Sequence, residues 1–153
     1  MSHKATMKVD LYDEDALRDT LTELGIQFVE QATWIAYNER ENTPVDFLIE
    51  KGSSALYDRQ YRYAGIGFRN NSGKLELVMD GLDEGSTCYK SLVKKFKKIY
   101  TEKAAANLLS QYGYRVEKQP DGIYRATATA RTISALSRQA QTKSKQQVRI
   151  GRY

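Results

Sequence analysis

The sequence predicts an α+β fold in which one antiparallel sheet of five to seven strands packs against two helices. Three observations predict this class. Residues 4–11 alternate strictly between apolar and polar side chains, as in a strand with one buried face. Residues 13–24 and 86–112 carry apolar side chains at helical spacing between a capping residue and a glycine. The segments between and after these helices have strand composition and are separated by turn residues.

The first strand and the first helix are the clearest elements. The apolar face of the strand consists of Ala5, Met7, Val9 and Leu11. Asp13 is a good N-cap, and two acids follow it in the first helical turn, where the helix dipole favours anions. Gly25 ends the helix as a glycine with left-handed backbone, and the apolar stripe before it is Leu17, Leu21 and Leu24.

Five further strands are predicted before the second helix, at residues 26–30, 33–37, 45–50, 65–69 and 74–80. The last two are joined by Asn70-Asn71-Ser72-Gly73, whose composition is typical of a tight hairpin turn. In the segment after this turn, Leu75, Leu77 and Met79 alternate with Lys74, Glu76 and Val78, as in the second strand of a hairpin.

The second helix is predicted from Ser86 or Thr87 to Tyr112, with Gly113 as its stop and a possible bend near residues 104–106. Its core face is expected to contain Tyr89, Leu92, Val93, Phe96, Ile99, Leu108, Leu109 and Tyr112, which leaves Lys94 in solvent. Strands at 114–118 and 123–130 follow, joined by a turn at Pro120-Asp121-Gly122.

One internal similarity suggests a duplicated unit. Residues 21–28 and 109–116 both read as a helix end, a capping glycine and the start of a strand. If the similarity is a true repeat, the domain consists of two related strand–helix–strand–strand halves. The alternative is that any joint between a helix and a strand uses glycine in this way.

The charge is divided unevenly along the chain. Residues 1–130 hold 18 Lys/Arg against 19 Asp/Glu, whereas residues 131–153 hold six cations and no anion. These cations are Arg131, Arg138, Lys143, Lys145, Arg149 and Arg152. We therefore expect an α+β domain over 1–130 and a basic extension over 131–153 that binds an acidic or polyanionic partner. The extension is expected to become ordered on contact with that partner, with a weak helix possible over 131–142.

The composition favours a soluble protein of a reducing compartment. Hydrophobic residues make up 41% of the chain, which is enough for a core. The single cysteine, Cys88, excludes an intramolecular disulfide. The N-terminus has no apolar stretch of signal-peptide length, and no segment reaches the roughly 18 apolar residues of a membrane span. We expect a cytoplasmic protein.

Several short motifs resemble one known family. They are the opening Met-Ser-His, Ala16-Leu17 to Leu24-Gly25, Ile66-Gly67-Phe68-Arg69, Glu76-Leu77-Val78-Met79-Asp80, Phe96 to Tyr100, Tyr112-Gly113-Tyr114 and Asp121-Gly122-Ile123. Together they resemble the hypothetical chloroplast reading frame thirty-five family, a group of small cyanobacterial, plastid and other bacterial proteins without established activity. The resemblance covers roughly residues 1–130, and residues 51–64 and the basic tail depart from it. It implies the strand–helix order, an intracellular setting (plastid stroma if plastid-encoded) and no reaction.

The sequence contains few of the residue patterns that catalytic and cofactor sites require. His3 is the only histidine, so one chain cannot form a His-based metal cluster, and a catalytic triad would depend on a terminal residue. Cys88 lies at a helix start, where the dipole lowers the pKa of a thiol, but packing under the helix is the favoured explanation. Gly65-Ile66-Gly67 lacks the third glycine of a dinucleotide loop. Asp80, Asp83 and Glu84 could attract a divalent cation, although acids at a helix start also complement the dipole. We expect no cofactor and no metal.

Three basic features are candidates for binding. Tyr57, Tyr61 and Tyr63 alternate with Arg59 and Arg62, a combination that suits single-stranded nucleic acid, or else covers a sheet edge. Lys90, Lys94 and Lys98 recur every four residues on the second helix, as a binding patch or simply a solvated face. The basic tail is the third.

These features predict a non-catalytic adaptor that docks on a larger protein or nucleoprotein assembly through its domain and its tail. The alternative is a protein that binds RNA or DNA directly, using the Tyr/Arg loop, the lysine stripe and the tail together. A third class, an enzyme with an unfamiliar carboxylate site near Asp80, has the least support.

Overall fold

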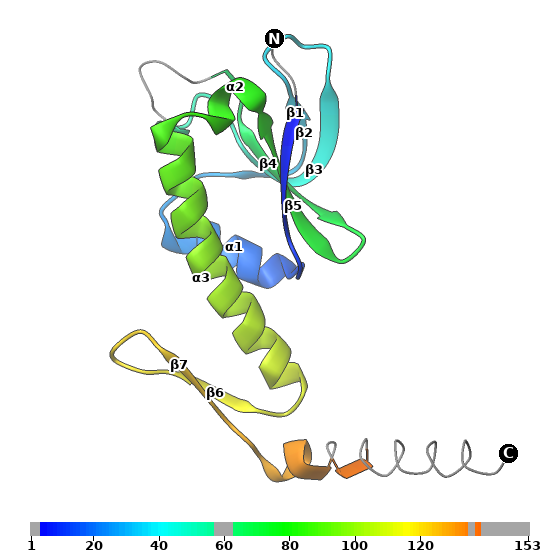
Figure 1. The fold of residues 1–153 in the computed structure, drawn as a ribbon, viewed down its shortest axis with the longest axis vertical. Coiled ribbons are helices and arrows are strands. Elements are labelled where there is room, and N and C mark those ends of the chain that lie inside the picture. The colour runs from blue at the N-terminus through cyan, green and yellow to red at the C-terminus, as the bar shows by residue number, and fades with distance from the viewer. Residues whose placement is uncertain (1–3, 57–62, 135–136, 139–153) are drawn as a thin grey trace, which may run out of the picture. The chain divides into compact units, whose positions relative to one another are not determined.

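The computed structural model describes residues 4–56, 63–134 and 137–138, and divides the chain into two compact units, residues 1–104 and 105–153 (Figure 1). The first unit is an α+β domain. Its antiparallel sheet has the strand order β1-β5-β4-β3-β2. The strands are β1 (Lys4–Val9), β2 (Val29–Ile35), β3 (Asn42–Ile49), β4 (Ile66–Asn71) and β5 (Lys74–Asp80). The predicted fold class is confirmed.

The described part of the first unit contains three short helical elements and most of one long helix, which continues into the second unit. They are α1 (Glu14–Glu23), the 3-10 turn η1 (Ser54–Leu56) and the single turn α2 (Gly81–Glu84), and the long helix is α3 (Thr87–Gln111). The side chain of Asp13 accepts a hydrogen bond from the Ala16 amide at 2.9 Å, so the predicted N-cap of α1 is confirmed.

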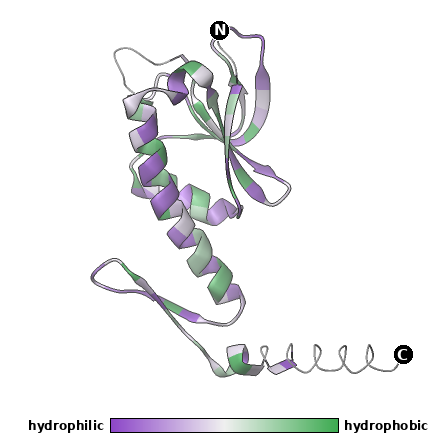
Figure 2. Cartoon of the chain, in the orientation of Figure 1, coloured by the Kyte–Doolittle hydropathy of each residue, from purple (hydrophilic) through white to green (hydrophobic). Residues whose placement is uncertain are grey.

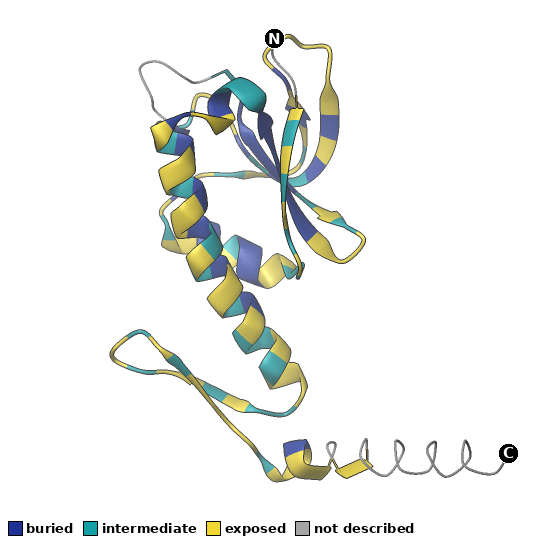
Figure 3. Ribbon diagram, viewed as in Figure 1, coloured by how far each residue is buried: buried dark blue, intermediate teal, exposed yellow. Residues whose placement is uncertain are grey.

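The main core lies between one face of the sheet and the helices α1 and α3. From the sheet come Phe47, Ile49, Ile66, Phe68, Leu75, Leu77 and Met79, and from the helices Ala16, Leu17, Leu21, Tyr89, Val93, Phe96, Tyr100 and Ala104. Phe96 is 1% exposed and Lys94 is exposed, as the helical periodicity predicts. Figure 3 shows this buried layer in dark blue along the inner side of α3.

One tyrosine ties α3 to the start of α1. The Tyr100 hydroxyl donates to the Leu11 carbonyl at 2.6 Å and accepts from the Asp13 amide at 2.9 Å. Burial raises the pKa of Tyr100 to about 12, so the hydroxyl keeps its proton and can serve as donor and acceptor together.

A second, smaller core lies on the opposite face of the sheet. It consists of Trp34, Ala36, Val45, Ala64 and Val78. β3 pairs with β4 only from Phe47 to Ile49, and beyond that point the Asp46 carboxylate accepts the Asn70 amide at 2.8 Å. The part of the β2–β3 hairpin that contains Trp34 and Val45 is therefore not paired with β4, and it packs against the face of the sheet that carries the second core. The Trp34 indole donates to the Gly65 carbonyl at 2.8 Å, which fixes the hairpin there.

Gly67 makes this close approach possible, and its replacement should be costly. A Cβ atom at Gly67 would lie 2.6 Å from Val45 Cγ1 and 3.3 Å from Trp34 Cβ. We expect Gly67→Ala to lower the free energy of unfolding by about 1–3 kcal/mol, measured by urea denaturation, because the small core must shift. Gly52→Ala is the matched control, since nothing lies within 4 Å of a Cβ there. Equal stability of the two variants would contradict the packing described.

The hairpin between β4 and β5 has the predicted turn. Ser72 and Gly73 both have positive φ, 54° and 83°, as the two central residues of a type I′ turn require. The predicted strands 26–30 and 33–37, in contrast, are wrong as separate elements, because residues 29–35 form the single strand β2. Gln31, with φ of 51°, interrupts the pairing with β3 in the middle of that strand. The adjacent polar residues Glu30 and Gln31, both exposed, interrupt the apolar pattern of the strand, which is why the sequence reads as two strands.

The second unit begins inside α3. The antiparallel strands β6 (Arg115–Lys118) and β7 (Tyr124–Thr127) form a separate two-stranded ribbon. Residues 130–134 and 137–138 are helical, and the rest of the predicted helix over 131–142 lies outside the described residues. The predicted turn at residues 120–122 is present, with Gly122 at φ of 85°.

The order of elements bears on the suggested repeat. The series β1-α1-β2-β3 and β5-α2-α3-β6-β7 have the same strand–helix–strand–strand order, apart from the added single turn α2. The joints Gly25 and Gly113 both have positive φ, 69° and 88°. The pairing differs, because β2 and β3 belong to the large sheet whereas β6 and β7 pair only with each other. A duplication stays a prediction.

Candidate binding surface

The positive charge of the protein belongs to the second unit. Residues 105–153 contain nine Lys/Arg and two Asp/Glu, whereas residues 1–104 contain fifteen Lys/Arg and seventeen Asp/Glu. The excess therefore includes Arg115, Lys118 and Arg125 as well as the predicted tail. Because these residues share one compact unit, the whole unit is the candidate binding surface.

The second unit starts with the C-terminal end of α3, which a capping motif terminates. The Tyr114 amide donates to the Leu109 carbonyl at 3.1 Å, and the Gly113 amide donates to the Ser110 carbonyl at 3.0 Å. This pair of bonds around a glycine with positive φ is a Schellman motif. It ends the helix after Gln111, one residue before the predicted end at Tyr112, and turns the chain into β6.

A pair of threonines attaches the next helical segment to that end. The Thr132 amide donates to Thr129 Oγ1 at 3.3 Å, and the Thr129 amide donates to Thr132 Oγ1 at 3.2 Å, which is a reciprocal N-terminal cap. The Thr129 hydroxyl also donates to the Gly113 carbonyl. A Cβ atom at Gly113 would lie 3.3 Å from Arg131 Cγ, so the stem of Arg131 crosses directly over the glycine.

These contacts create a hollow of about 390 Å³, lined by Gln111, Tyr112, Arg131, Ser134 and Arg138. Two predicted binding residues, Arg131 and Arg138, are thus brought together. Arg131 and Ser134 belong to the helical residues 130–134, and Arg138 belongs to the helical residues 137–138. The sequence did not single out Gln111, Tyr112 or Ser134 as site residues. The one signal for Tyr112 was its place before the capping glycine, and it was assigned to the core.

The second unit has almost no core of its own. Thr132, 2% exposed, is the only buried residue among those that the structure describes between 105 and 138. The prediction that Leu108 and Tyr112 face a core is wrong, since they are 38% and 58% exposed. The reason is that a two-stranded ribbon and a short helix offer too little apolar surface to cover them. Ile123 and Ile133 are also exposed, and Figure 2 shows such hydrophobic residues within the unit.

Of the other predicted binding residues, the structure describes three and leaves eight outside the described residues. Lys90, Lys94 and Lys98 are all exposed on α3, so the lysine stripe faces solvent as predicted, and a binding role for it stays a prediction. Eight further candidates lie outside the described residues, namely Tyr57, Arg59, Tyr61, Arg62, Lys143, Lys145, Arg149 and Arg152. His3 also lies outside them.

The carboxylates near α2 are occupied by the protein itself. Asp80 accepts from the Leu82 amide at 3.0 Å, as the N-cap of α2, and from the Tyr37 amide at 3.1 Å. Asp83 accepts from the amides of Tyr63 and Ala64, at 2.9 and 2.7 Å. Both aspartates are fully buried. Across the described residues, no group of three or more His, Cys, Asp and Glu side chains has an arrangement able to hold a metal ion.

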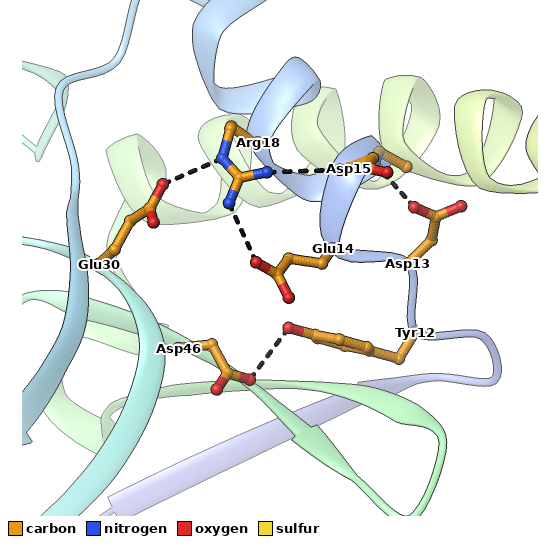
Figure 4. A network of polar contacts seen from close by, with 8 residues as sticks. Tyr12, Asp13, Glu14, Asp15, Arg18, Glu30 and Asp46 are labelled. Carbon is orange, nitrogen blue, oxygen red and sulfur yellow. Dashed lines mark hydrogen bonds and ion pairs between the residues drawn. The ribbon is translucent and has the colours of Figure 1, made fainter.

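A second polar network lies in the first unit, at the start of α1 (Figure 4). Arg18 pairs with Glu14 at 3.0 Å, Asp15 at 3.4 Å and Glu30 at 3.0 Å, which joins α1 to β2. The Tyr12 hydroxyl donates to Asp46 at 3.0 Å, and burial, followed by this bond, raises its pKa above the ordinary value. One guanidinium group is shared by three carboxylates, and the bonds from Arg18 to Glu30 and from Tyr12 to Asp46 connect the α1 region to the sheet.

The comparison with family models decides the family. The model described as protein of unknown function, DUF1257, matches residues 20–126, which is more than two thirds of the chain. The chain belongs to the DUF1257 family. The match covers the end of α1, the strands β2 to β5, α3 and most of the β6–β7 ribbon, and it ends before the basic extension. Neither the curated proteins nor the solved structures gave a significant match.

Membership of the DUF1257 family assigns no reaction, since the family is itself of unknown function. None of the helices formed by the described residues is both long and apolar enough to cross a bilayer.

Removal of residues 131–153 should leave the first unit folded. Every residue of its two cores lies at or before Ala104, so a chain that ends at Ala130 should keep a cooperative thermal transition within a few degrees of the full-length protein. Circular dichroism at 222 nm would measure both transitions. A truncated chain without a cooperative transition would show that the extension stabilises the domain.

Proposed function

We propose that this DUF1257 protein is a non-catalytic adaptor that docks on a larger protein assembly through its second unit. The observation that carries the proposal is a surface of arginine and exposed apolar side chains on a unit with almost no core. Its described cations are four arginines and one lysine, Arg115, Arg125, Arg131, Arg138 and Lys118. The exposed apolar side chains are Leu108, Tyr112, Ile123 and Ile133.

This composition is that of a protein interface. Interfaces between proteins are enriched in arginine and aromatic residues and depleted in lysine, because guanidinium groups are weakly hydrated and bind carboxylates through two parallel bonds. A unit that buries little by itself also gains apolar burial when it docks. The partner surface would be acidic and partly apolar.

The absence of a catalytic role is part of the same proposal. The buried carboxylates Asp80 and Asp83 bind backbone amides, and Cys88 contacts the Ala55 carbonyl at 3.6 Å. Among the side chains that the structure places, these were the candidates closest to a reactive site, and each has a structural task. We propose no cofactor for this protein.

Direct binding of RNA or DNA is the second candidate, and one observation favours it. Lys90, Lys94 and Lys98 are exposed in a row on α3, where they could follow a phosphate backbone together with the Tyr/Arg loop and the tail. If the six tail cations contact duplex phosphates, the logarithm of affinity should fall against the logarithm of salt with a slope of about −5.

A photo-crosslinking residue at two positions would separate these candidates. Placed at Ile123, in the second unit, it should form cross-links in the cell to one or a few proteins, which mass spectrometry identifies. Thr22, exposed on α1 in the first unit, is the matched control and should give few such products. Nucleic acid as the main product at Ile123, or equal protein cross-links at both positions, would contradict docking through the second unit.

We also propose that the chain belongs to the cyanobacterial and plastid branch of its family, the hypothetical chloroplast reading frame thirty-five proteins. The motifs at residues 66–69, 76–80 and 112–114 support this. The protein would then reside in the cytoplasm, or in the stroma if plastid-encoded. Fractionation of the source cells tests the location, and recovery with the membranes after a salt wash would contradict it.

A further inference from the structure

We propose that the lysine face of α3, in the first unit, binds the phosphate backbone of double-stranded nucleic acid without reading its sequence. The lysine face is the exposed side of residues 87–101, and its cations are Lys90, Lys94, Lys95 and Lys98. The inference goes beyond the proposed function, because it gives the adaptor a second ligand on the first unit, apart from the surface that docks on protein.

Only three residue types are exposed on this part of α3. Between residues 87 and 101, every exposed side chain is a lysine, a serine or a threonine (Figure 3). The hydroxyl groups come from Thr87, Ser91 and Thr101, whose spacing places them on the same side of the helix as Lys94. Lysine, serine and threonine side chains are typical donors to phosphate oxygens in protein–DNA complexes.

The charges of the lysine face are not neutralised by the part of the protein that the structure describes. Residues 85–101 contain five lysines and no acidic residue. No ion pair between described residues involves Lys90, Lys94, Lys95 or Lys98. The face is therefore a continuous positive surface.

This charge pattern works against the helix that carries it. Lys94 is four residues from both Lys90 and Lys98, so like charges lie next to each other on successive turns. The first turn of α3 also has no acidic residue, although the helix dipole favours anions there. On α1, in contrast, two acids occupy the first turn and Arg18 pairs with both. An arrangement that opposes local stability is expected where a ligand supplies the opposite charge.

The composition of the face favours double-stranded nucleic acid over other polyanions. Protein interfaces are depleted in lysine. A helix that lies on a membrane needs exposed apolar side chains to insert, and those of Val93, Phe96 and Tyr100 are buried in the core. Single-stranded nucleic acid is bound by aromatic side chains on which its bases stack, and none is exposed between residues 87 and 101. Contacts to phosphates alone suit a duplex, whose bases are already stacked.

The length of the face also suits a duplex. Lys90 and Lys98 are eight residues apart, which corresponds to a rise of roughly 12 Å along α3. A duplex carries one negative charge per roughly 1.7 Å of its axis, so about seven phosphate charges lie within that length. Because lysine is a point charge on a flexible stem, each lysine can reach a phosphate without a fixed geometry.

The test uses the full-length chain and a fluorescein-labelled DNA duplex of mixed sequence, with fluorescence anisotropy measured over a series of salt concentrations. Each lysine that contacts a phosphate adds about one to the slope of log affinity against log salt. In the triple variant Lys90→Gln, Lys94→Gln and Lys98→Gln, the slope should therefore be smaller by about three. Affinity at low salt should be at least about tenfold weaker. An RNA duplex of the same sequence shows which duplex is preferred, and lysine-dependent binding of either supports the proposal.

The matched control is the triple variant Lys4→Gln, Arg40→Gln and Lys51→Gln, which removes three exposed cations of the same unit and the same net charge. Its slope should change by less than about one. Equal losses in the two variants, or a native slope in the lysine variant with an unchanged thermal transition, would overturn the proposal. So would a native chain that binds neither duplex at low salt.

Other polyanions serve as competing probes. Oligothymidine, phosphatidylserine vesicles and a polyglutamate peptide represent a single strand, a membrane surface and an acidic protein. If any of them bound more tightly than both duplexes, and lost that affinity in the variant of Lys90, Lys94 and Lys98, the assignment to a duplex would be wrong.

The outcomes also separate this inference from the proposed function. Protein cross-links at Ile123 without binding of either duplex would refute the phosphate-binding face alone. Duplex binding through the lysine face without protein cross-links at Ile123 would refute docking through the second unit and leave this inference standing.

Discussion

Replacing Phe96 by alanine should lower the free energy of unfolding by about 3–5 kcal/mol, a large part of the stability of a small domain. Phe96 is 1% exposed at the centre of the main core. Its ring lies 4.8 Å from that of Phe68 on β4 and is stacked on Tyr100 at 5.4 Å. The cavity left by the ring would therefore remove contacts with both the sheet and α3.

Lys94→Ala is the matched control on the same helix. Lys94 is exposed, so its replacement should change the free energy of unfolding by roughly half a kcal/mol or less. Urea denaturation followed by tryptophan fluorescence would measure both, since Trp34 is the single tryptophan and is fully buried. If Lys94→Ala were the costlier change, the assigned face of α3 would be reversed.

These residues also show what local patterns can predict. The Asp13 cap, the Ser72-Gly73 turn and the buried phase of α3 around Phe96 all follow from short-range rules, and all three are present. The second core does not follow from such rules. It depends on Gly67 accepting Val45 and Trp34 from a hairpin that crosses the sheet, and alternation along one strand carries no signal for that contact.

The sequence predicted only part of the candidate site, because here too local patterns are visible in the sequence and long-range contacts are not. Charge alone indicated Arg131 and Arg138, because a cluster of cations can be counted along the chain. That they line a hollow with Tyr112 depends on the bond from the Thr129 hydroxyl to the Gly113 carbonyl, which joins residues distant in sequence. Helical periodicity extended the core face through Leu108 and Tyr112, since the period does not report where the covering sheet ends.

The acidic residues before α3 are another example of side chains whose role depends on long-range contacts. From the sequence, Asp80, Asp83 and Glu84 are explained by the dipole of the long helix or by a divalent cation. Only Glu84 is exposed, and the two aspartates are buried acceptors for amides of α2, of Tyr37 and of residues 63–64. A buried carboxylate of this kind is detectable only when its distant donors are known.

Asp83→Ala should be among the most destabilising changes in the protein. Asp83 accepts the Tyr63 amide at 2.9 Å and the Ala64 amide at 2.7 Å, directly after the Tyr/Arg loop. Without the carboxylate these partly or fully buried donors have lost their acceptor, which should cost about 2–5 kcal/mol in the free energy of unfolding at pH 7. Glu84→Ala, an exposed neighbour in α2, should change it by roughly half a kcal/mol or less.

The loss of unfolding free energy caused by Asp83→Ala should also depend on pH, because burial changes the pKa of Asp83. Burial raises the pKa of Asp83 above its ordinary value, although the amide bonds from Tyr63 and Ala64 oppose the change. A carboxyl group with a raised pKa in the folded state contributes most below its unfolded pKa, near 3.8, and contributes less as pH rises through the folded value. The difference in unfolding free energy between the native chain and Asp83→Ala should therefore be larger at pH 4 than at pH 7, by urea denaturation at both. The other carboxylates are common to the two proteins, so their titration cancels in this difference, except for that of Asp80, which interacts electrostatically with Asp83. A difference that grows from pH 4 to pH 7 would show that the amide bonds outweigh burial, and that Asp83 is held as a fully charged acceptor.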